Sequence, residues 1–359
     1  MGLSSVLIEI LGFFKFLWTL FTVGFPEPIR LVNQPSSTKP FRLLHLPSLA
    51  HDVIFSEMST EELYHLSKCS RRSRYAVKMF TRRQKYYLNI ATGKSFCHLQ
   101  ISNRFCIETM YDIWREDIIQ PVDGNSLTTY STDFWATTKE EITYFFNVFT
   151  KKVHCLNFYD TTNVTRMTEL LKSATPLPVD WVWYNSSEID DHLYKYVLRE
   201  FKDAEELSID ASPSADFRFD DMQPFAGEYV TIKDADWLTV DNLTRCFMNV
   251  KKVRLGFDSN KCLNVLVFDQ FLNAWRNGLI VGKLDLECGC ITLDLQSILK
   301  NVPKTKVKRV EVGNKKTLFD DGKCFLIRQE ESGMEAIVYL SHSVGFTTHF
   351  RLLRDDESD

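Results

Sequence analysis

The chain has 359 residues, of which 44% are hydrophobic and 25% are charged, a profile typical of a folded soluble protein with one to three domains. Its formal net charge of −4 excludes a protein that binds nucleic acid through its overall charge. The nine cysteines lie at irregular positions, which excludes a disulfide framework and indicates reduced thiols in a cytoplasmic or nuclear protein.

The first 25 residues form an apolar segment. Its core, Leu3 to Phe25, is about long enough to cross a bilayer, but Glu9 and Lys15 interrupt it, and no basic residue precedes it as in a signal peptide. A marginal membrane segment, a helix at the membrane interface or docked on protein, and a tail without function all stay open. Residues 26–39 contain Pro, Ser and Gln, which is typical of a linker.

Residues 40–84 predict three short amphipathic helices. Pro47 suits a first helical turn, where its missing N–H has no intrahelical partner. The apolar residues that follow it at three-to-four spacing share one face: Leu49, Val53, Ile54 and Met58. Ser59 and Glu62 form a capping box that opens the second helix, and Ser70 can cap the third.

The second and third helices of this module combine an apolar stripe with positive charge. Leu63, Leu66 and Cys69 share one stripe of the second helix. From Glu61 to Lys85 the sequence carries eight Lys and Arg against two Glu, a local excess that favours an acidic partner. About forty residues cannot bury a core alone, so the module is expected to dock on another surface.

This order of features, a Leu-Pro start, a short helix, an acidic capping turn and then L-x-x-L-S-x-C-S-R-R, resembles the F-box. The F-box attaches substrate receptors to the Skp-family adaptor of cullin-based ubiquitin ligases. The resemblance implies these adaptor-facing residues: Leu46, Pro47, Leu49, Val53, Ile54, Leu63, Leu66, Cys69 and Arg72. The alternative is a small helical cap that only packs on the rest of the chain.

Residues 85–354 change to strand patterns. Lys85 to Ser102 predicts a hairpin around Thr92-Gly93. Strand-like runs then recur every 23 to 30 residues, beginning near Val153, Val179, Glu206, Tyr229, Val253, Lys283 and Val307. Helical patterns separate most of them, beginning near Thr165, Asp190, Thr239 and Val267.

The repeated strand and helix predict a leucine-rich-repeat-like α/β domain, in which the strands near Val153, Val179, Tyr229, Val253 and Lys283 are parallel neighbours. An ordinary α/β sandwich is the alternative. After Thr317 the pattern predicts an antiparallel β meander that closes the domain, before an acidic tail at 355–359. The expected fold class is therefore α+β, with a helical F-box module before the repeat-like domain.

The second half resembles the type-2 F-box-associated domain of nematode F-box proteins, from about Tyr229 to Leu352. The motifs that carry the resemblance are Trp237-Leu238-Thr239 and Phe271, Leu272 and Trp275, whereas Gln270 stands where that family usually has Asn. Because both tryptophans recur at helical spacing with leucines, core packing explains them better than a ligand site.

The chain contains no glycine-rich phosphate loop, H-E-x-x-H or G-x-S-x-G motif, and Cys288 and Cys290 lack zinc-motif spacing. We therefore expect no catalytic residue, metal or cofactor. The sequence predicts a substrate-recognition subunit of an SCF-type ubiquitin ligase, with the Skp-family adaptor, cullin through it, and an unknown protein substrate as partners. The alternatives are a membrane-tethered repeat scaffold and an unrecognised hydrolase. The expected location is cytoplasmic or nuclear, with membrane contact possible through residues 3–25 and no nucleic-acid partner.

Overall fold

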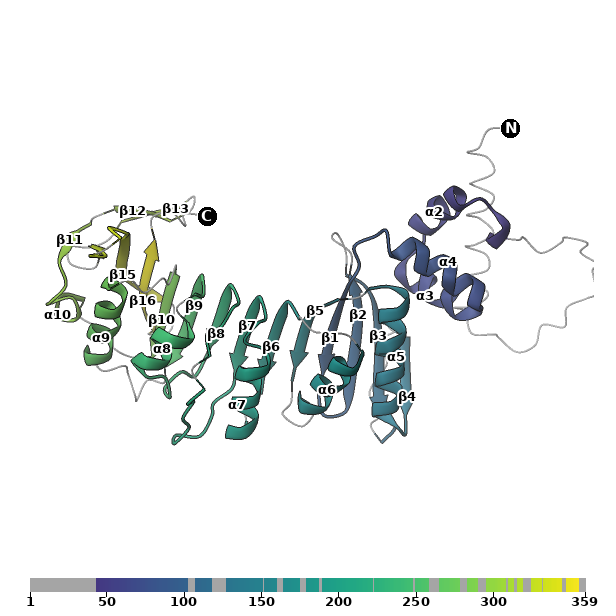
Figure 1. Ribbon diagram of the computed structural model, residues 1–359, viewed down its shortest axis with the longest axis horizontal. Helices are drawn as coiled ribbons and strands as arrows, with labels where there is room; N and C mark the ends of the chain where they lie inside the picture. Colours follow the sequence, from purple (N-terminus) through teal and green to yellow (C-terminus); the bar gives the residue numbers. More distant parts are fainter. Residues whose placement is uncertain are drawn as a thin grey trace, which may run out of the picture. The chain divides into compact units, whose positions relative to one another are not determined.

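The computed structural model describes residues 43–102, 107–117, 127–150, 152–159, 164–174, 179–186, 189–221, 223–247, 249–257, 265–277, 283–289, 295–307, 309–312, 315–318, 324–330, 332–343 and 347–354 (Figure 1). The apolar segment, the linker and the acidic tail lie outside these residues. Contacts divide the chain into two compact units, Met1–Leu46 and Pro47–Asp359. Among the described residues, no helix is both long and apolar enough to cross a membrane.

Three helices open the second unit, as the sequence predicts. They are α2 (Ser48–Ser56), α3 (Thr60–Cys69) and α4 (Arg71–Thr81), and a 3-10 turn, η1 (Leu43–His45), precedes them in the first unit. The capping box of α3 is confirmed, because the Glu62 amide donates to Ser59 Oγ at 3.2 Å and the Ser59 amide donates to Glu62 Oε2 at 2.8 Å. Ser70 caps α4 in the same reciprocal way with Ser73.

One large sheet runs through the rest of the described chain, in the order β11-β14-β15-β16-β10-β9-β8-β7-β6-β5-β1-β2-β3-β4. Its strands are β1 (Tyr87–Thr92), β2 (Phe96–Ser102), β3 (Ile107–Arg115), β4 (Leu127–Ser131), β5 (Val153–Phe158), β6 (Trp181–Asn185), β7 (Glu206–Asp210), β8 (Tyr229–Ile232), β9 (Lys252–Phe257), β10 (Lys283–Gly289), β11 (Lys304–Lys306), β14 (Cys324–Arg328), β15 (Glu335–Ser343) and β16 (Thr347–Arg354). The predicted hairpin is confirmed, because β1 and β2 pair antiparallel.

The six strands β5 to β10 lie side by side in chain order, and each is parallel to the next. This confirms the predicted parallel neighbours. Short crossover connections force this order, since each strand and helix must bury its apolar face against the neighbouring unit. The result is a large, mostly parallel sheet, and the leucine-rich-repeat-like assignment stays a prediction.

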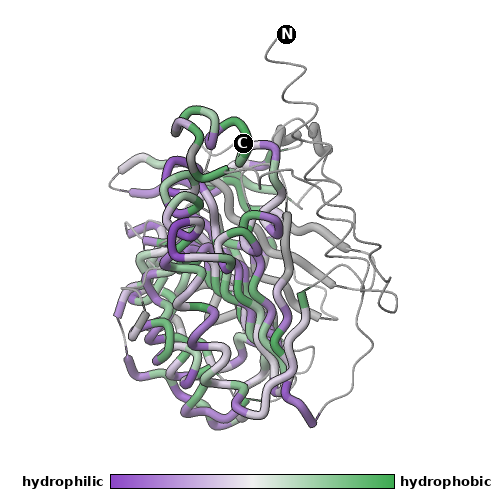
Figure 2. Tube along the Cα trace, turned by 90° about the vertical axis from the view of Figure 1, so that its right-hand side faces the viewer, coloured by the Kyte–Doolittle hydropathy of each residue, from purple (hydrophilic) through white to green (hydrophobic). Residues whose placement is uncertain are grey.

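Helices cover one face of this sheet, as Figure 2 shows with the helices to the left of the strands. They are α5 (Phe134–Val148), α6 (Val164–Ala174), α7 (Asp191–Glu200), α8 (Val240–Cys246), α9 (Val265–Arg276) and α10 (Leu295–Ile298). Alternate residues are buried along several of the strands, such as Leu207 and Ile209 in β7 and Val253 and Leu255 in β9. Trp237 and Trp275 are buried too, which confirms the prediction that they pack in the core.

The meander that closes the sheet is confirmed as well. β16 pairs antiparallel with β10, and β15, β14 and β11 follow in antiparallel order. The run near Val307 departs from the prediction, because β12 (Arg309–Val312) pairs with β13 (Lys315–Leu318) in a separate two-stranded sheet. Gly-Asn follows Val312 in the sequence, a dipeptide typical of a hairpin turn, so this run pairs with its neighbour instead of extending the parallel series.

Candidate functional site: the helical module and its base

The core of the three-helix module is apolar. Phe55, Val77 and Phe80 are buried in it, and the rings of Phe55 and Phe80 meet edge to face at 5.5 Å. Leu63 has no exposed surface either. The resemblance implies that Leu63 faces the adaptor, and an adaptor-facing residue should be partly exposed in the free chain; this expectation is wrong for Leu63, which is fully buried on the helix that packs against α4.

The other predicted adaptor-facing residues of the second unit keep contact with solvent. Leu49 is 75% exposed and Val53 is 43% exposed, one helical turn apart on α2. The remaining ones are exposed (Pro47, Cys69, Arg72) or half-buried (Ile54, Leu66). Leu46, at the end of the first unit, is half-buried. Large apolar side chains at such exposure are typical of an interaction surface.

Two exposed apolar residues of α4 were missed by the sequence reasoning. Tyr75 is 65% exposed and Met79 is 40% exposed, and they lie four residues apart. Their spacing on an otherwise basic helix is a signal that could have identified them. An ion pair between Asp52 of α2 and Arg83, just after α4, connects the two helices that carry these exposed groups. The residues of the module that keep contact with solvent, including the half-buried Ile54 and Leu66, are called the exposed module residues: Pro47, Leu49, Val53, Ile54, Leu66, Cys69, Arg72, Tyr75 and Met79.

The opposite side of the module rests on α5 of the sheet region. The Tyr64 hydroxyl donates to Glu141 Oε2 at 3.0 Å, and Lys68 Nζ donates to the two Glu141 oxygens at 3.1 and 3.2 Å. The hydroxyl oxygen of Tyr144 lies 2.6 Å from Ser67 Oγ, and Lys68 Nζ lies 3.6 Å from the centre of the Tyr144 ring. The alternative prediction, a helical cap packed on the rest of the chain, thus describes this side of the module.

These titratable groups stabilise the base and are not arranged for acid–base chemistry. Burial raises the pKa of Tyr64 far above its usual range, and the negative charge of Glu141 raises it further. Burial also raises the pKa of Tyr144 and of Tyr111, whose ring lies 5.5 Å from that of Tyr64. All three phenols therefore stay protonated at neutral pH, so that the Tyr64 phenol remains a hydrogen-bond donor to the Glu141 carboxylate.

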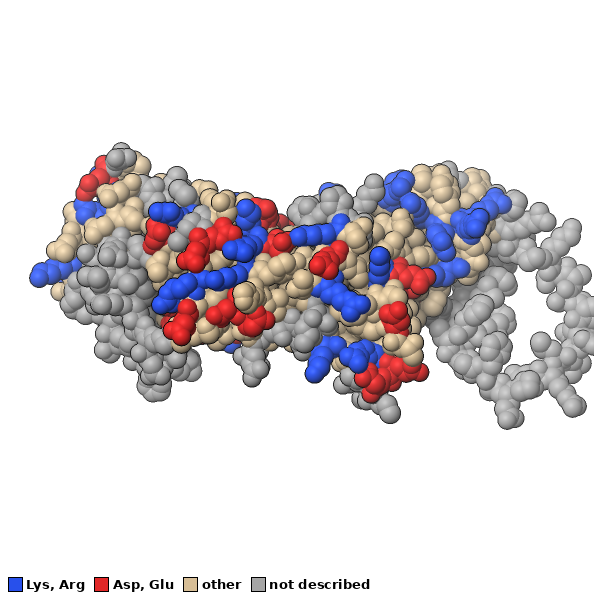
Figure 3. Space-filling model, turned by 60° about the horizontal axis from the view of Figure 1, so that its bottom comes forward, with Lys and Arg blue, Asp and Glu red and all other residues tan. Residues whose placement is uncertain are grey.

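Positive charge gathers on the surface of the module, at the right-hand end in Figure 3. Arg71, Arg72 and Arg74 of α4 are exposed. The guanidinium of Arg74 also lies 5.1 Å from the centre of the Tyr144 ring, so part of this charge supports the base. Elsewhere on the visible face, acidic and basic side chains alternate.

Comparison with known protein families decides what this module is. The F-box domain matches residues 43–85, the segment that contains all three helices. The chain carries an F-box. No curated protein and no solved structure matches the chain, so the nematode family and its F-box-associated domain stay predictions.

An F-box supports the expected role as a non-enzyme, since F-box proteins are generally substrate adaptors. The described residues include no group of three or more His, Cys, Asp and Glu that could hold a metal ion. The adjacent carboxylates of Asp190 and Asp191 have separate partners: Asp190 caps α7 by accepting from the Leu193 amide, and Asp191 accepts hydrogen bonds from the amide and hydroxyl of Ser214. These carboxylates have structural partners in the described chain.

Proposed function

We propose that this protein is the substrate-recognition subunit of an SCF-type E3 ubiquitin ligase. The F-box binds the Skp-family adaptor and, through it, cullin, while the leucine-rich-repeat-like sheet domain binds a protein substrate. Such a receptor needs no catalytic residue, because it holds substrate lysines near the ubiquitin carrier and so raises their effective concentration.

The observation that carries this proposal is the two-sided F-box. Its base is fixed on α5 through Glu141 and Tyr144, while Leu49 and Val53 of α2 stay exposed on a module whose core is already complete. Exposed apolar side chains on a rigid support are favourable anchors for a partner, since little conformational entropy is lost on binding. We assign adaptor contact to the exposed module residues and to Leu46.

The second candidate is a membrane-tethered repeat scaffold that does not join a ligase. Its support is the apolar sequence of residues 3–25, which lie outside the described residues. We favour a cytoplasmic or nuclear receptor, and the full chain's behaviour without detergent separates the two. Partition into the soluble fraction at high salt contradicts a membrane tether.

The central experiment measures capture of a purified Skp-family adaptor by the full chain. We expect Leu49→Asp combined with Val53→Asp to abolish capture, because a buried, unpaired charge costs about 3–5 kcal/mol in an interface. Both side chains are exposed in the free chain, so thermal unfolding should stay unchanged. Tyr229→Asp, at a comparably exposed aromatic residue of β8, is the matched control and should capture normally. Capture that survives the double substitution contradicts adaptor binding and favours the scaffold.

A further inference from the structure

A pocket of about 380 Å³ opens on the sheet over β1, β2 and β5. We call it the open-face pocket. The lining side chains that can contact a ligand are polar or aromatic: Asn89, Phe96, His98, Gln100, Asn157 and Tyr159.

This pocket lies on the face of the sheet that points away from the helices in Figure 2. Phe158 of β5 points toward the helices, since its ring lies 6.0 Å from that of Phe201, just after α7. Successive side chains of a strand point to opposite faces, so Asn157 points away from the helices. In β2 the pocket residues likewise alternate with Cys97 and Leu99, which are fully buried.

The hollow exists because the middle strand, β1, offers small residues where its neighbours carry larger ones. Ala91 of β1 pairs with His98 of β2 on one side and with Asn157 of β5 on the other. Gly93 follows β1, and a Cβ on it would lie 2.3 Å from Phe96 Cε1, so the Phe96 ring lies directly over this glycine. The small residues form the floor of the pocket, and the larger side chains form its walls.

Three side-chain amides in the walls keep hydrogen-bonding groups for a ligand. The Oδ1 atom of Asn89 is buried and has no hydrogen-bond partner among the described residues, so it lacks a donor. Asn157 accepts from Cys155 Sγ at 3.3 Å, which leaves its amide hydrogens unused. Gln100 lies opposite Asn89 in the β1–β2 ladder and makes no side-chain hydrogen bond within the part of the chain that the structure describes. The walls therefore offer both donors and acceptors.

His98 adds an imidazole whose orientation is fixed by a carboxylate. Its Nδ1 atom lies 2.6 Å from Asp112 Oδ1, and the Asp112 side chain is only 11% exposed. A carboxylate oxygen accepts, so Nδ1 donates to it and Nε2 is left for a ligand. Asp112 itself is not part of the pocket lining.

Two aromatic rings flank the polar groups. The Phe96 ring lies 4.5 Å from that of His98 and 6.2 Å from that of Tyr159, to which it is inclined by 41°. Tyr159 is 52% exposed, and its amide donates to the Thr92 carbonyl at 2.9 Å. Rings inclined in this way form an open wedge, which does not match the parallel slot that a flat base needs for stacking on both faces.

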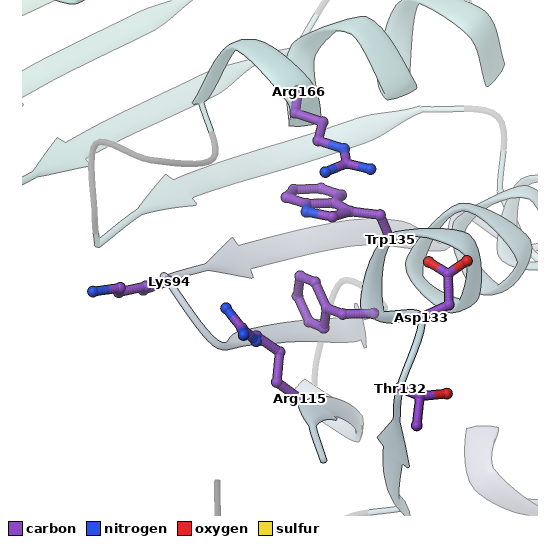
Figure 4. Close-up of a pocket in the computed structure, with 7 residues that line it drawn as sticks. Lys94, Arg115, Thr132, Asp133, Trp135 and Arg166 are labelled. Atoms are coloured by element: carbon purple, nitrogen blue, oxygen red, sulfur yellow. The ribbon is translucent and has the colours of Figure 1, made fainter. Parts of the chain in front are cut away.

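The open-face pocket has no Lys, Arg, Asp or Glu in its lining. A second pocket, of about 500 Å³, differs in this respect, because the cations Lys94, Arg115 and Arg166 line it (Figure 4). A charged ligand that entered the open-face pocket would lose water without gaining an opposite charge. The lining thus favours an uncharged ligand that is rich in hydrogen-bonding groups.

We propose that the open-face pocket binds a neutral sugar ring. A sugar hydroxyl both donates and accepts, so one ring can serve Nε2 of His98 and the three amides together. The C–H face of a sugar is apolar and packs on aromatic side chains, here those of Phe96 and Tyr159. This binding activity goes beyond the proposed ligase function and does not depend on it.

The test is ligand-observed NMR of the full chain with the methyl glycosides of glucose, galactose, mannose and N-acetylglucosamine as probes. We expect saturation transfer to at least one of them, strongest at the ring C–H protons that pack on Phe96 and Tyr159. An array of neutral oligosaccharides distinguishes a free monosaccharide from the end of a longer glycan. Glucuronic acid and glucosamine carry a charge on a similar ring and should bind at least about tenfold more weakly than methyl glucoside.

Variants of the walls connect this binding to the pocket. Tyr159→Ala and Asn157→Ala should each weaken sugar binding about tenfold, whereas Tyr159→Phe keeps the aromatic ring and should bind normally. Asn185→Ala is the matched control, because Asn185 is an exposed amide on the same face of the neighbouring strand β6 but outside the pocket lining.

Three results would overturn the inference. They are a failure of every neutral glycoside and oligosaccharide to bind, binding that survives Tyr159→Ala combined with Asn157→Ala, and tighter binding of glucuronic acid than of methyl glucoside. Adenosine tests a flat base as the alternative, and tighter binding of adenosine than of every sugar would replace the sugar by a nucleobase. Adaptor capture should be normal in all these variants, so this inference and the ligase function fail separately.

Discussion

Glu141 joins the F-box to the sheet domain through one carboxylate. Its side chain is 11% exposed and accepts hydrogen bonds from both Tyr64 and Lys68. A carboxylate this buried is stable only while its oxygens are paired, so the three residues act as a unit. They hold α3 on α5 while the exposed module residues face solvent.

Replacing Glu141 by Gln should lower the free energy of unfolding by about 1–3 kcal/mol, because the charge-assisted bonds to Tyr64 and Lys68 become weaker neutral ones. Urea unfolding followed by circular dichroism measures the change. Glu140→Gln, at the exposed neighbouring position, is the control and should change stability by less than about 0.5 kcal/mol. Identical unfolding midpoints for the two variants would contradict a stabilising role of the Glu141 cluster.

The free thiols provide a second test of the exposed surface. Burial raises the pKa of Cys155, Cys246 and Cys324 to about 11, so these thiols stay protonated and shielded at pH 8. Cys69 is exposed at the end of α3. Among the described cysteines, Cys69 is thus the accessible one.

Iodoacetamide at pH 8 should therefore label Cys69 ahead of the four buried described cysteines, as measured by peptide mass spectrometry. A saturating Skp-family adaptor should slow the labelling of Cys69 several-fold, since the proposed interface covers it. Raising the pH toward 11 should increase the labelling of Cys155, Cys246 and Cys324, because their thiolates form near that pH. Unchanged Cys69 labelling with adaptor bound would remove this residue from the proposed contact set.

Neighbouring strand-and-helix repeats pack closely enough at two positions to require glycine. A Cβ on Gly256 of β9 would lie 2.2 Å from the Lys233 carbonyl oxygen, and one on Gly227 would lie 2.1 Å from the Ala204 carbonyl oxygen. Both obstacles are backbone atoms of the neighbouring segment, so the chain itself must shift to make room. Glycine at these positions sets the spacing of adjacent units.

Gly256→Ala should accordingly destabilise the protein by about 1–3 kcal/mol through displaced backbone. Gly93→Ala is the comparison, because its Cβ would meet only the end of the Phe96 ring, which can rotate away. Thermal unfolding of both variants should show the larger loss for Gly256→Ala. A larger loss of thermal stability for Gly93→Ala would contradict the close approach of Gly256 to the Lys233 carbonyl as the stronger constraint.

The sequence identified some elements better than others for physical reasons. The parallel strands were predictable because their apolar runs are continuous and evenly spaced. Helix α5 was not, since its Thr, Ile, Tyr and Phe residues favour strands, and packing against α4 and β3 outweighs that preference. The local signal for this helix is Asp133, whose carboxylate caps the first turn by accepting a hydrogen bond from the Ala136 amide.

Some residues of the candidate site could likewise be predicted from the sequence, and others could not. The spacing predicted that Leu49 and Val53 share one face of α2, the F-box resemblance implied that this face meets the adaptor, and both side chains are exposed in the structure. Spacing alone could not tell that Leu63 faces inward, because a stripe has the same period whether it faces the core or a partner. The pocket lined by Lys94, Arg115 and Arg166 could not be predicted from the sequence, because these residues come together only through the order of the strands in the sheet.

At the level of the whole chain, the three helices of the F-box and the sheet domain belong to one compact unit, Pro47–Asp359. The ring of Tyr64 stacks on that of Phe145 at 5.4 Å, and Tyr111 of β3 lies beside both. The change from helices to strands near residue 85 is therefore a change of secondary structure within that unit. Removing the F-box would take away the Tyr64 ring and expose the rings of Phe145 and Tyr111.

A chain that begins at Lys85 should melt at least roughly 3–4 °C below the full chain, because the contacts of α3 and α4 with α5 are worth at least about 2 kcal/mol. Differential scanning calorimetry should show one cooperative transition in the full chain. As a control, a chain that begins at Pro40 keeps the F-box and should melt with the full chain. Equal melting temperatures for all three chains would show that the F-box folds independently of the sheet.

The contact between α4 and α5 also has a consequence during protein synthesis. Thr81 Oγ1 donates to the carbonyl of Val148, 67 residues further along the chain. At roughly 5–20 residues per second, a ribosome needs roughly 3–13 s to synthesise that interval. For this time the nascent F-box lacks Glu141 and Tyr144, so its base is incomplete. We therefore expect the F-box to gain its full support on α5, and with it its most stable contact with a ligase, only after the first part of the sheet domain has been synthesised.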